Sequence, residues 1–272
     1  MARFLFVNGI ETVKIVYLGD VVAKCGREAV ITAIPQLKQK YKYDALIVNV
    51  DNAAHGFGCT AKIARNLLNA GANALVCGDH VWDQKELLAF LDECPRIVRP
   101  LNYNDNLAGC GAKVIPLDNG KKLLVIEVVG RVFMENVDNP LHKTEEILQK
   151  YRLKYEVDAI FIDIHAEATA EKQAFARYFD GRVSAVIGSH THVPTADAVI
   201  LPRGTAYQTD AGMCGNYDGV IGFNQYAPIE RLKHPDASAR LEPLDGKATI
   251  CGTFIEIDDT NGLASKIIPI KE

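Results

Sequence analysis

The chain has 272 residues, which is enough for one large domain or two small ones with a substantial buried core. Apolar residues make up 48% of the chain and charged residues 24%, and this balance excludes a largely disordered protein. The formal net charge of −4 disfavours nucleic acid as the main partner, because proteins that bind phosphate backbones usually present a basic face.

The N-terminal stretch and the cysteines bear on the compartment. No apolar run approaches the roughly 20 residues that span a bilayer, and the N-terminus lacks the long apolar stretch and cleavage site of a signal peptide. None of the seven cysteines forms a CxxC pair. We therefore expect a cytoplasmic protein with free, buried thiols, no membrane association and no cysteine-based zinc site.

Short β-rich runs alternate with helix-length stretches in the first third of the chain. Thr60 and Gly71 are typical residues for the start and the end of a helix. Asp83 and Glu86, three residues apart, match the capping-box pattern of a helix start. We predict strands at 14–19, 45–50 and 74–78, and helices at 27–40, 61–70 and 83–92.

The alternation changes after residue 110. Two apolar runs flank Asn119-Gly120, a residue pair typical of a tight hairpin turn. The C-terminal third, from Asp197, is rich in short strands and turns, so the chain is predicted to be an α/β domain with mixed sheets. The remaining predicted elements are a hairpin at 112–117 and 122–130, helices at 141–154 and 169–179, and strands at 159–164, 184–189 and 249–258.

Five of the predicted strands run directly into side chains of metal-binding type. In open α/β sheets, ligands bind beyond the carboxyl ends of the strands, so the five clusters would meet at one edge if the strands share a sheet. A structural alternative exists for each, because Asp or Asn after a strand often caps the next helix and a buried histidine can simply be hydrogen-bonded. The clusters are Asp20, Asp51-Asn52, Asp79-His80, His165 and His190-x-His192.

The pair His190-x-His192 favours metal coordination most clearly, because two imidazoles flanked by small residues follow a buried strand. The chain contains no GxxxxGK[ST], GxSxG or GxGxxG motif. Nucleotide hydrolysis by a P-loop and serine hydrolysis are therefore unsupported.

Other polar residues lack this context. Glu171 and Lys172 are interpreted as part of a solvated helix face. The remaining histidines are interpreted as surface or loop residues, although His55 lies close enough to Asp51 in sequence to line a site there. They are His55, His142 and His234.

Several motifs occur together in a fixed order. They include GDVVAKCGR (19–27), DNAAHGFGCT (51–60), GDHVWDQKE (78–86), DIHAEATAEK (163–172) and GSHTHVPTAD (188–197). In these motifs the chain resembles the calcineurin-like metallophosphoesterases, and among them the YmdB group of bacterial phosphodiesterases. The resemblance covers residues 14 to about 222 and continues more loosely to the C-terminus. We therefore expect one domain at 14–272, with residues 1–13 as an N-terminal extension.

The resemblance implies a mixed β-sandwich flanked by helices, in α/β/β/α layers, with a dinuclear metal site at the C-terminal ends of the strands. By position, Asp20, Asn52 and His192 would hold one metal ion. Asp79, His165 and His190 would hold the second, Asp51 would bridge both, and His80 would be the general acid. The family hydrolyses 2′,3′- and 3′,5′-cyclic nucleotides, usually with iron or manganese.

Two positions depart from the family pattern, which usually has Glu at Asp51 and Asn at Asp79. The shorter Asp51 must bridge ions about 3.5–4 Å apart. Asp79 adds a negative charge, which we expect to tighten metal binding and to reduce the attraction of the site for an anionic phosphate. These departures leave open an alternative, a metal-binding regulatory or phosphoester-binding protein with weak or no turnover.

The expected chemistry follows from such a centre. A metal-bound hydroxide would attack phosphorus, and a protonated His80 would donate its proton to the leaving ribose oxygen. Nitrogen and oxygen ligands suit zinc or nickel as well as iron or manganese. The expected partner is a small-molecule phosphodiester; a phosphomonoester, a short RNA end, a homo-oligomer and a metal-free domain with structural histidines all stay open.

Overall fold

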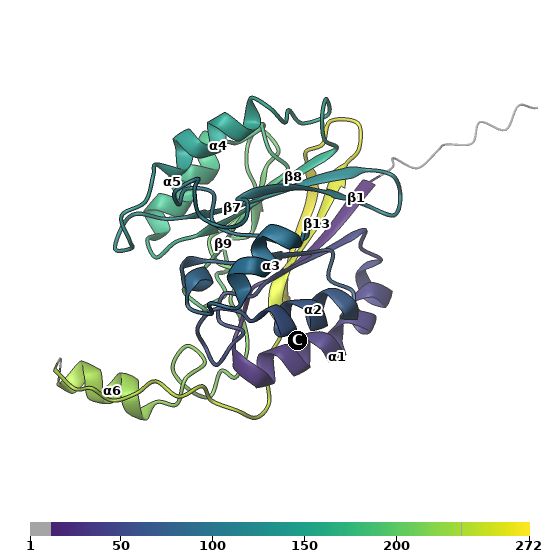
Figure 1. Ribbon diagram of the computed structural model, residues 1–272. Helices are drawn as coiled ribbons and strands as arrows, with labels where there is room; N and C mark the ends of the chain where they lie inside the picture. The colour runs from purple at the N-terminus through teal and green to yellow at the C-terminus, as the bar shows by residue number, and fades with distance from the viewer. Residues whose placement is uncertain (1–11, 235) are drawn as a thin grey trace, which may run out of the picture.

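The computed structural model describes residues 12–234 and 236–272. Two six-stranded sheets lie face to face, with α1, α2 and α3 on one outer side and α4 and α5 on the other (Figure 1). This arrangement confirms the expected mixed α/β sandwich flanked by helices. Residues 1–11 of the predicted extension lie outside the described part, and Thr12 and Val13 already belong to the first strand.

The first sheet has the strand order β14-β13-β1-β3-β4-β5. Its parallel half, β1 to β5, arises from βαβ units, and β13 and β14 join as an antiparallel pair on the other side of β1. The strands are β1 Thr12–Leu18, β3 Ala45–Asn49, β4 Ala74–Val76, β5 Ile97–Val98, β13 Cys251–Asp258 and β14 Ala264–Lys271. The helices of this side are α1 Ala23–Tyr41, α2 Ala61–Ala70 and α3 Leu87–Glu93.

The second sheet has the order β10-β11-β9-β8-β7-β6, with parallel strands in its centre and one antiparallel strand at each edge. Its strands are β6 Ala112–Pro116, β7 Lys122–Val129, β8 Ala159–His165, β9 Ala185–Ser189, β10 Val199–Ile200 and β11 Ala206–Gln208. Its helices are α4 Pro140–Leu148 and α5 Thr169–Tyr178. A two-stranded sheet, a 3-10 helix and a projecting helix complete the fold: β2 Asp20–Val21, β12 Met213–Cys214, η1 Asp79–Trp82 and α6 Tyr226–Lys233 (Figure 1).

The core has three apolar layers, because successive side chains of a strand point to opposite faces of its sheet. Ile15 and Phe161 point into the space between the sheets. Val16 packs under α1 and α2, and Ile162 packs under α4 and α5. Burial on both faces explains why the central strands read as continuous apolar runs.

Several predicted turns and caps are confirmed. The Thr60 hydroxyl accepts the Ile63 N–H at 3.2 Å, and Gly71 follows the end of α2 with a positive φ. The predicted hairpin is β6–β7, and Gly120 supplies its turn with a φ of +83°. Within the described residues, no helix combines the length and apolar character needed to cross a membrane.

Three helix boundaries were predicted wrongly. The helix predicted to start at Asp83 begins at Leu87, because the Asp83 carboxylate binds His80 instead of capping the helix. α1 begins at Ala23, four residues before its predicted start. α4 ends at Leu148, and the following residues form turns in which the Glu156 carboxylate accepts the Arg152 N–H.

Candidate metal centre

The five strand-end clusters meet at one edge of the molecule, but they come from two sheets. Asp20, Asp51 and Asp79 stand beyond β1, β3 and β4 of the first sheet. His165 ends β8 and His190 follows β9, both in the second sheet. The strands do not share one sheet, and the clusters meet because the sandwich aligns the carboxyl ends of both sheets.

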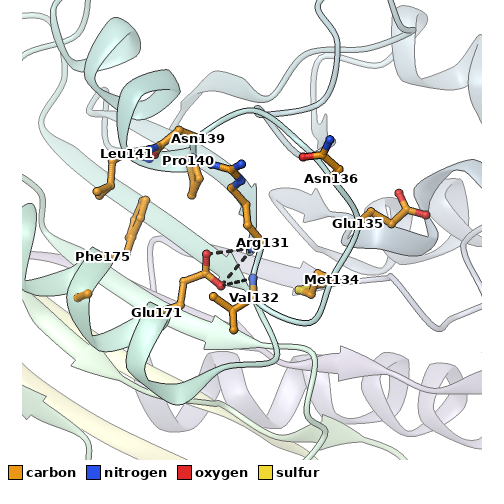
Figure 2. Close-up of a pocket in the computed structure, with 11 residues that line it drawn as sticks. Arg131, Val132, Met134, Glu135, Asn136, Asn139, Pro140, Leu141, Glu171 and Phe175 are labelled. Carbon is orange, nitrogen blue, oxygen red and sulfur yellow. Dashed lines mark hydrogen bonds between the residues drawn. The ribbon is translucent and has the colours of Figure 1, made fainter.

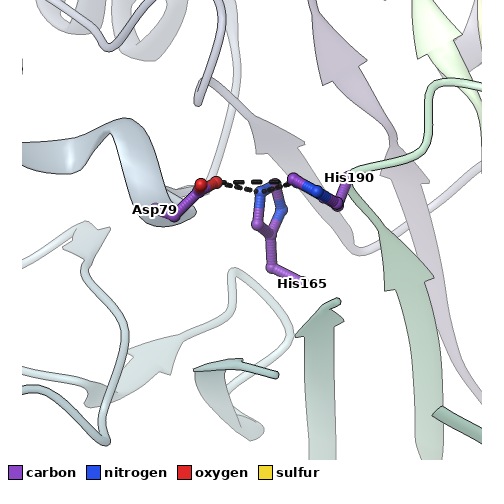
Figure 3. Close-up of side chains that lie close together, drawn as sticks. All are labelled: Asp79, His165 and His190. Atoms are coloured by element: carbon purple, nitrogen blue, oxygen red, sulfur yellow. Dashed lines mark hydrogen bonds and ion pairs between the residues drawn. The ribbon is translucent and has the colours of Figure 1, made fainter. Parts of the chain in front are cut away.

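The contacts are closest among Asp79, His165 and His190 (Figure 3). His165 Nε2 lies 2.9 Å from Asp79 Oδ1 and 3.1 Å from His190 Nδ1. The three groups offer ligand atoms that all lie within 4.8 Å of one another. This spacing suits a single cation with nitrogen and oxygen ligands.

Asp20 and Asp51 flank this trio from the buried side. Asp20 Oδ1 lies 3.7 Å from His165 Nδ1, and Asp51 Oδ2 lies 3.4 Å from His165 Nε2. The second oxygen of each carboxylate accepts a backbone N–H, that of His190 for Asp20 and that of His80 for Asp51. Asp20 Oδ1 and Asp51 Oδ2 receive no hydrogen bond from the part of the chain that the structure describes.

Asn52 and His192 face each other on the other side of Asp51. His192 Nε2 lies 3.1 Å from Asn52 Oδ1, and His192 Nδ1 donates to the Ile221 carbonyl at 2.8 Å. Asn52 Nδ2 donates to the Gly56 carbonyl, so its oxygen is directed at His192. The hydrogen bond at Nδ1 leaves the lone pair of His192 on Nε2, which is the state that a metal ligand requires.

His80 stands at the rim, with its side chain 30% exposed. Its Nδ1 lies 2.9 Å from Asp83 Oδ2, and its ring packs edge-on against Phe57 at 5.1 Å. His80, Asp51 and Asp79 also form a group of closely spaced ligand-type atoms. Because Nδ1 is engaged by Asp83, Nε2 is the atom that can exchange a proton with a bound molecule.

Burial and mutual charge shift the acidity of the buried groups. Burial raises the pKa of Asp20 to about 7. Burial alone would lower the pKa of His165, but Asp51 and Asp79 outweigh it and hold that pKa well above the usual value. Burial would raise the pKa of Asp79, but hydrogen bonds to His165 and His190 hold it well below its usual range. The cluster concentrates negative charge that favours bound positive charge.

A hydrogen-bonded chain behind His165 orients its ring. His165 Nδ1 lies 2.8 Å from Ser189 Oγ, and Ser189 donates to Asp163 Oδ1 at 2.6 Å. Tyr17 and Asn49 donate to the other oxygen of Asp163. The proton of neutral His165 is therefore on Nδ1, and Nε2 faces Asp79 and His190 as a potential ligand.

A buried ion pair supports the loop that carries His190 and His192. Lys172 Nζ donates to Asp210 Oδ2 at 2.9 Å and to the Ser189 carbonyl, and both charged side chains are fully buried. Asp210 also accepts both the N–H and the hydroxyl of Thr191. The solvated-face interpretation of Lys172 was therefore wrong, whereas Glu171 is half-buried and its carboxylate accepts the N–H groups of residues 131 and 132.

The loop needs such support because its backbone is unusual. His190 and His192 have φ values of +94° and +65°, a region that non-glycine residues rarely occupy. Sequence reasoning missed Lys172, Asp210 and Ser189, which act only through long-range contacts. A signal was present for Asp163, since it is a lone carboxylate inside the apolar run AIFIDI.

The residues present fit a metal centre. Two buried carboxylate oxygens lack a hydrogen-bond donor among the described residues, and the nitrogens of His165 and His190 converge on the same space. Gly78 makes room for this arrangement, since a Cβ there would lie 2.3 Å from His165 Nε2. A buried, unpaired carboxylate is costly unless it is protonated or bound to a cation.

A separate hollow of about 490 Å3 lies between the loop after β7 and helix α5 (Figure 2). Met134 and Phe175 supply apolar wall, and the Glu171 carboxylate binds the backbone beside Arg131. None of the eight predicted site residues lines this hollow. The predicted metal site and this hollow are therefore separate places in the molecule.

Comparison with known proteins identifies the family of the chain. Residues 16–270 match the model of a family described as YmdB-like protein. A Bacillus subtilis (strain 168) protein named 2′,3′-cyclic-nucleotide 2′-phosphodiesterase is 45% identical over 254 residues, which cover 93% of this chain and 95% of that protein.

Two solved structures share the fold. A hypothetical protein from Thermus thermophilus is 37% identical with a TM-score of 0.88, covering 95% of this chain and 98% of its own. A phosphatase from Mycoplasma pneumoniae is 35% identical with a TM-score of 0.89, covering 97% and 94%. This chain is a hydrolase that belongs to the YmdB-like family, within the metallophosphoesterases.

Proposed function

We propose that this hydrolase cleaves cyclic-nucleotide phosphodiesters, both 2′,3′ and 3′,5′, at a dinuclear metal centre. The observation that carries the proposal is the pair of buried carboxylate oxygens, Asp20 Oδ1 and Asp51 Oδ2, that receive no hydrogen bond from the described residues. They lie beside converging histidine nitrogens at the edge of both sheets. The substrate class follows the name of the relative from Bacillus subtilis.

The ligands divide into two groups around Asp51. Asp79, His165 and His190 would hold one ion, which is supported by their mutual distances. Asn52 and His192, facing each other at 3.1 Å, would hold the other together with Asp20. Asp51 would contribute to both ions.

The donor set is nitrogen and oxygen, which suits iron or manganese and also zinc or nickel. When bound, two such ions would neutralise phosphate charge and supply a nucleophile near neutral pH. The buried carboxylates of the chain would hold the ions in place, and the exposed rim beside His80 and His190 would admit the substrate.

His80 would act as the general acid. Asp83 binds its Nδ1 and holds the ring in one orientation, while the packing against Phe57 limits rotation. A proton on Nε2 could then pass to the leaving ribose oxygen, since an alkoxide is a poor leaving group unless it is protonated.

The first experiment measures metal content by mass spectrometry on protein purified without chelator, with turnover of 2′,3′- and 3′,5′-cyclic AMP on the same sample. About two ions per chain with turnover of both substrates is expected. Two ions without turnover would favour the alternative of a regulatory, phosphoester-binding protein, which the presence of Asp51 and Asp79 motivates. No metal after addition of Mn or Fe would contradict the site assignment.

A second experiment tests His80 through the leaving group. His80→Ala is expected to slow 2′,3′-cyclic AMP hydrolysis by about a hundredfold or more. The same variant is expected to retain most turnover of bis-p-nitrophenyl phosphate, because p-nitrophenolate leaves without protonation. Equal losses on both substrates would count against the general-acid role.

The compartment and the domain boundary belong to the same proposal. All seven cysteines are free and six are buried, which supports a reducing compartment such as the cytoplasm. A single catalytic domain at 14–272 is supported by the family match over residues 16–270. Its substrate would be a small phosphodiester, and a homo-oligomer is compatible with this function.

A further inference from the structure

A hollow of about 810 Å3 is separated from His80 by the side chain of Phe57. Phe57, whose ring packs against the His80 ring, lines it, and so does Gln84, whose amide donates to the Phe57 carbonyl at 2.9 Å. His55, two residues before Phe57 in the loop that follows Asp51 and Asn52, also lines it. The proposed general acid and this hollow therefore share a wall.

The other lining residues are 231 and 240–243, and residues shortly before them in the chain contact the metal centre and Phe57. The Ile221 carbonyl accepts the Nδ1 proton of His192. Phe223 packs against Phe57 and so closely against Gly56 that a Cβ at Gly56 would lie 2.6 Å from the Phe223 ring. The distance between the hollow and the proposed ligands is thus set by direct contacts.

The hollow is basic although the protein is acidic. Arg231 and Arg240 both line it, and Glu242 is its one acidic lining residue. Two groups of the Arg231 guanidinium donate to the Ala239 carbonyl, which holds this side chain in place. Arg240 has no hydrogen bond or ion pair with any residue that the structure describes, so its charge is free to bind an anion.

The position of the leaving group connects His80 with this hollow. A general acid protonates the leaving oxygen, so the leaving group must lie on the His80 side of the phosphorus. From there it would extend along the apolar face of Phe57 toward the two arginines. A leaving group that fills this space would carry a sugar and base against Phe57 and a negative charge near Arg240.

We propose that this hollow binds a second phosphate on the leaving group, so that the preferred substrate is a 2′,3′-cyclic nucleotide that also carries a phosphate on its 5′ oxygen. The inference rests on the proposed function and specifies its substrate. The same chemistry occurs in a free cyclic nucleotide with a 5′-phosphate and at the 3′ end of a short oligonucleotide with a 2′,3′-cyclic phosphate.

The test compares two substrates that differ by one phosphate, adenosine 2′,3′-cyclic phosphate and the same compound with a 5′-phosphate, on metal-loaded protein. The wild type is expected to show about tenfold higher kcat/KM for the 5′-phosphorylated substrate, since one charged hydrogen-bonded pair has about that effect. Arg240→Gln is expected to bring the ratio close to one. Lys266→Gln, which removes the same charge from an exposed position on β14, is expected to keep the wild-type ratio.

The outcomes separate this inference from the proposed function. Turnover of both substrates with a wild-type ratio near one would overturn the inference and leave the proposed function intact. A high ratio that Arg240→Gln does not change would place the phosphate elsewhere and would also overturn it. No turnover of either substrate would overturn the proposed function and this inference with it.

A dinucleotide ending in a 2′,3′-cyclic phosphate distinguishes a free nucleotide from an oligonucleotide end as the source of the second phosphate. Its kcat/KM is expected to match that of the 5′-phosphorylated substrate only if an oligonucleotide end is accepted.

Discussion

Two clusters of buried charge lie on either side of the loop after β9, and they differ in one respect. Lys172 and Asp210 satisfy each other, and Asp210 also binds Thr191 and the Gly212 N–H. In the other cluster, Asp20 and Asp51 each keep one buried oxygen without a hydrogen-bond donor among the described residues. The Lys172 cluster is complete, because each buried charge has a partner, and it stabilises the fold. The cluster around Asp20 and Asp51 is incomplete, because buried carboxylate oxygens lack a donor, and it is suited to bind a cation from outside the chain.

Glu127 sharpens this comparison, because both of its carboxylate oxygens are also buried without a partner in the described part of the chain. It lies beside Asp163 between the sheets, and no histidine among the described residues forms a hydrogen bond or ion pair with it. Burial and the neighbouring Asp163 raise the pKa of Glu127 well above its usual value. We therefore expect Glu127, which has no nitrogen ligand beside it, to hold a proton, whereas the acids beside His165 could hold a metal ion.

The largest effect is expected from His165→Ala. This change removes the imidazole that contacts Asp79, Asp51 and His190, so one ion should be lost. We expect turnover to fall by at least about a thousandfold, or about 4 kcal/mol in the barrier. Metal content and kcat are measured together, with His142→Ala on the exposed side of α4 as the matched control. Full metal content in His165→Ala would contradict the site.

Lys172→Met breaks the complete cluster. Because Asp210 is then buried without its counter-charge, the free energy of unfolding is expected to fall by about 3–5 kcal/mol. The double change Lys172→Met with Asp210→Asn is expected to recover part of that loss, because no unpaired charge remains. Denaturant titration measures both variants, and Lys24→Met, which removes an exposed lysine, serves as the control. A Lys172→Met protein as stable as the wild type would show that the pair does not hold the loop.

Asp79→Asn tests the extra charge in the incomplete cluster. The neutral amide should weaken metal binding by about tenfold and lower KM for an anionic diester, since it removes one negative charge beside the phosphate. Metal titration and the KM for bis-p-nitrophenyl phosphate give the two readouts. If neither changes, the departure from the family pattern at Asp79 has no functional consequence.

The smallest change at fixed pH is expected from Glu127→Gln. At pH 5 the wild-type carboxyl is protonated in the folded protein, so a glutamine should alter stability by only about 1 kcal/mol. As the pH rises above about 4.5, the unfolded chain releases this proton and the folded protein keeps it, so wild-type stability falls. Glu127→Gln should lack this decrease. Urea denaturation at pH 5 and pH 8 checks it, and equal pH dependence in both proteins would refute the protonated state.

The sequence by itself determined the local features. Continuous apolar runs specify strands buried on both faces, and Asn119-Gly120 specifies the hairpin turn. The five strand-end clusters were also readable, because the carboxyl end of a strand is a local position. The structure brings all eight predicted site residues to one edge, and their roles as ligands and acid are what the proposed experiments test.

Only the tertiary structure decided how these parts meet. The strand ends come from two sheets, since strand order depends on contacts between distant segments such as β1 and β13. Lys172 reads as a surface residue until α5 packs it against Asp210, 38 positions away. There a partner supplied by the fold outweighed the local preference, because a charged side chain is stabilised by the partner it meets in the folded protein, most strongly where it is buried.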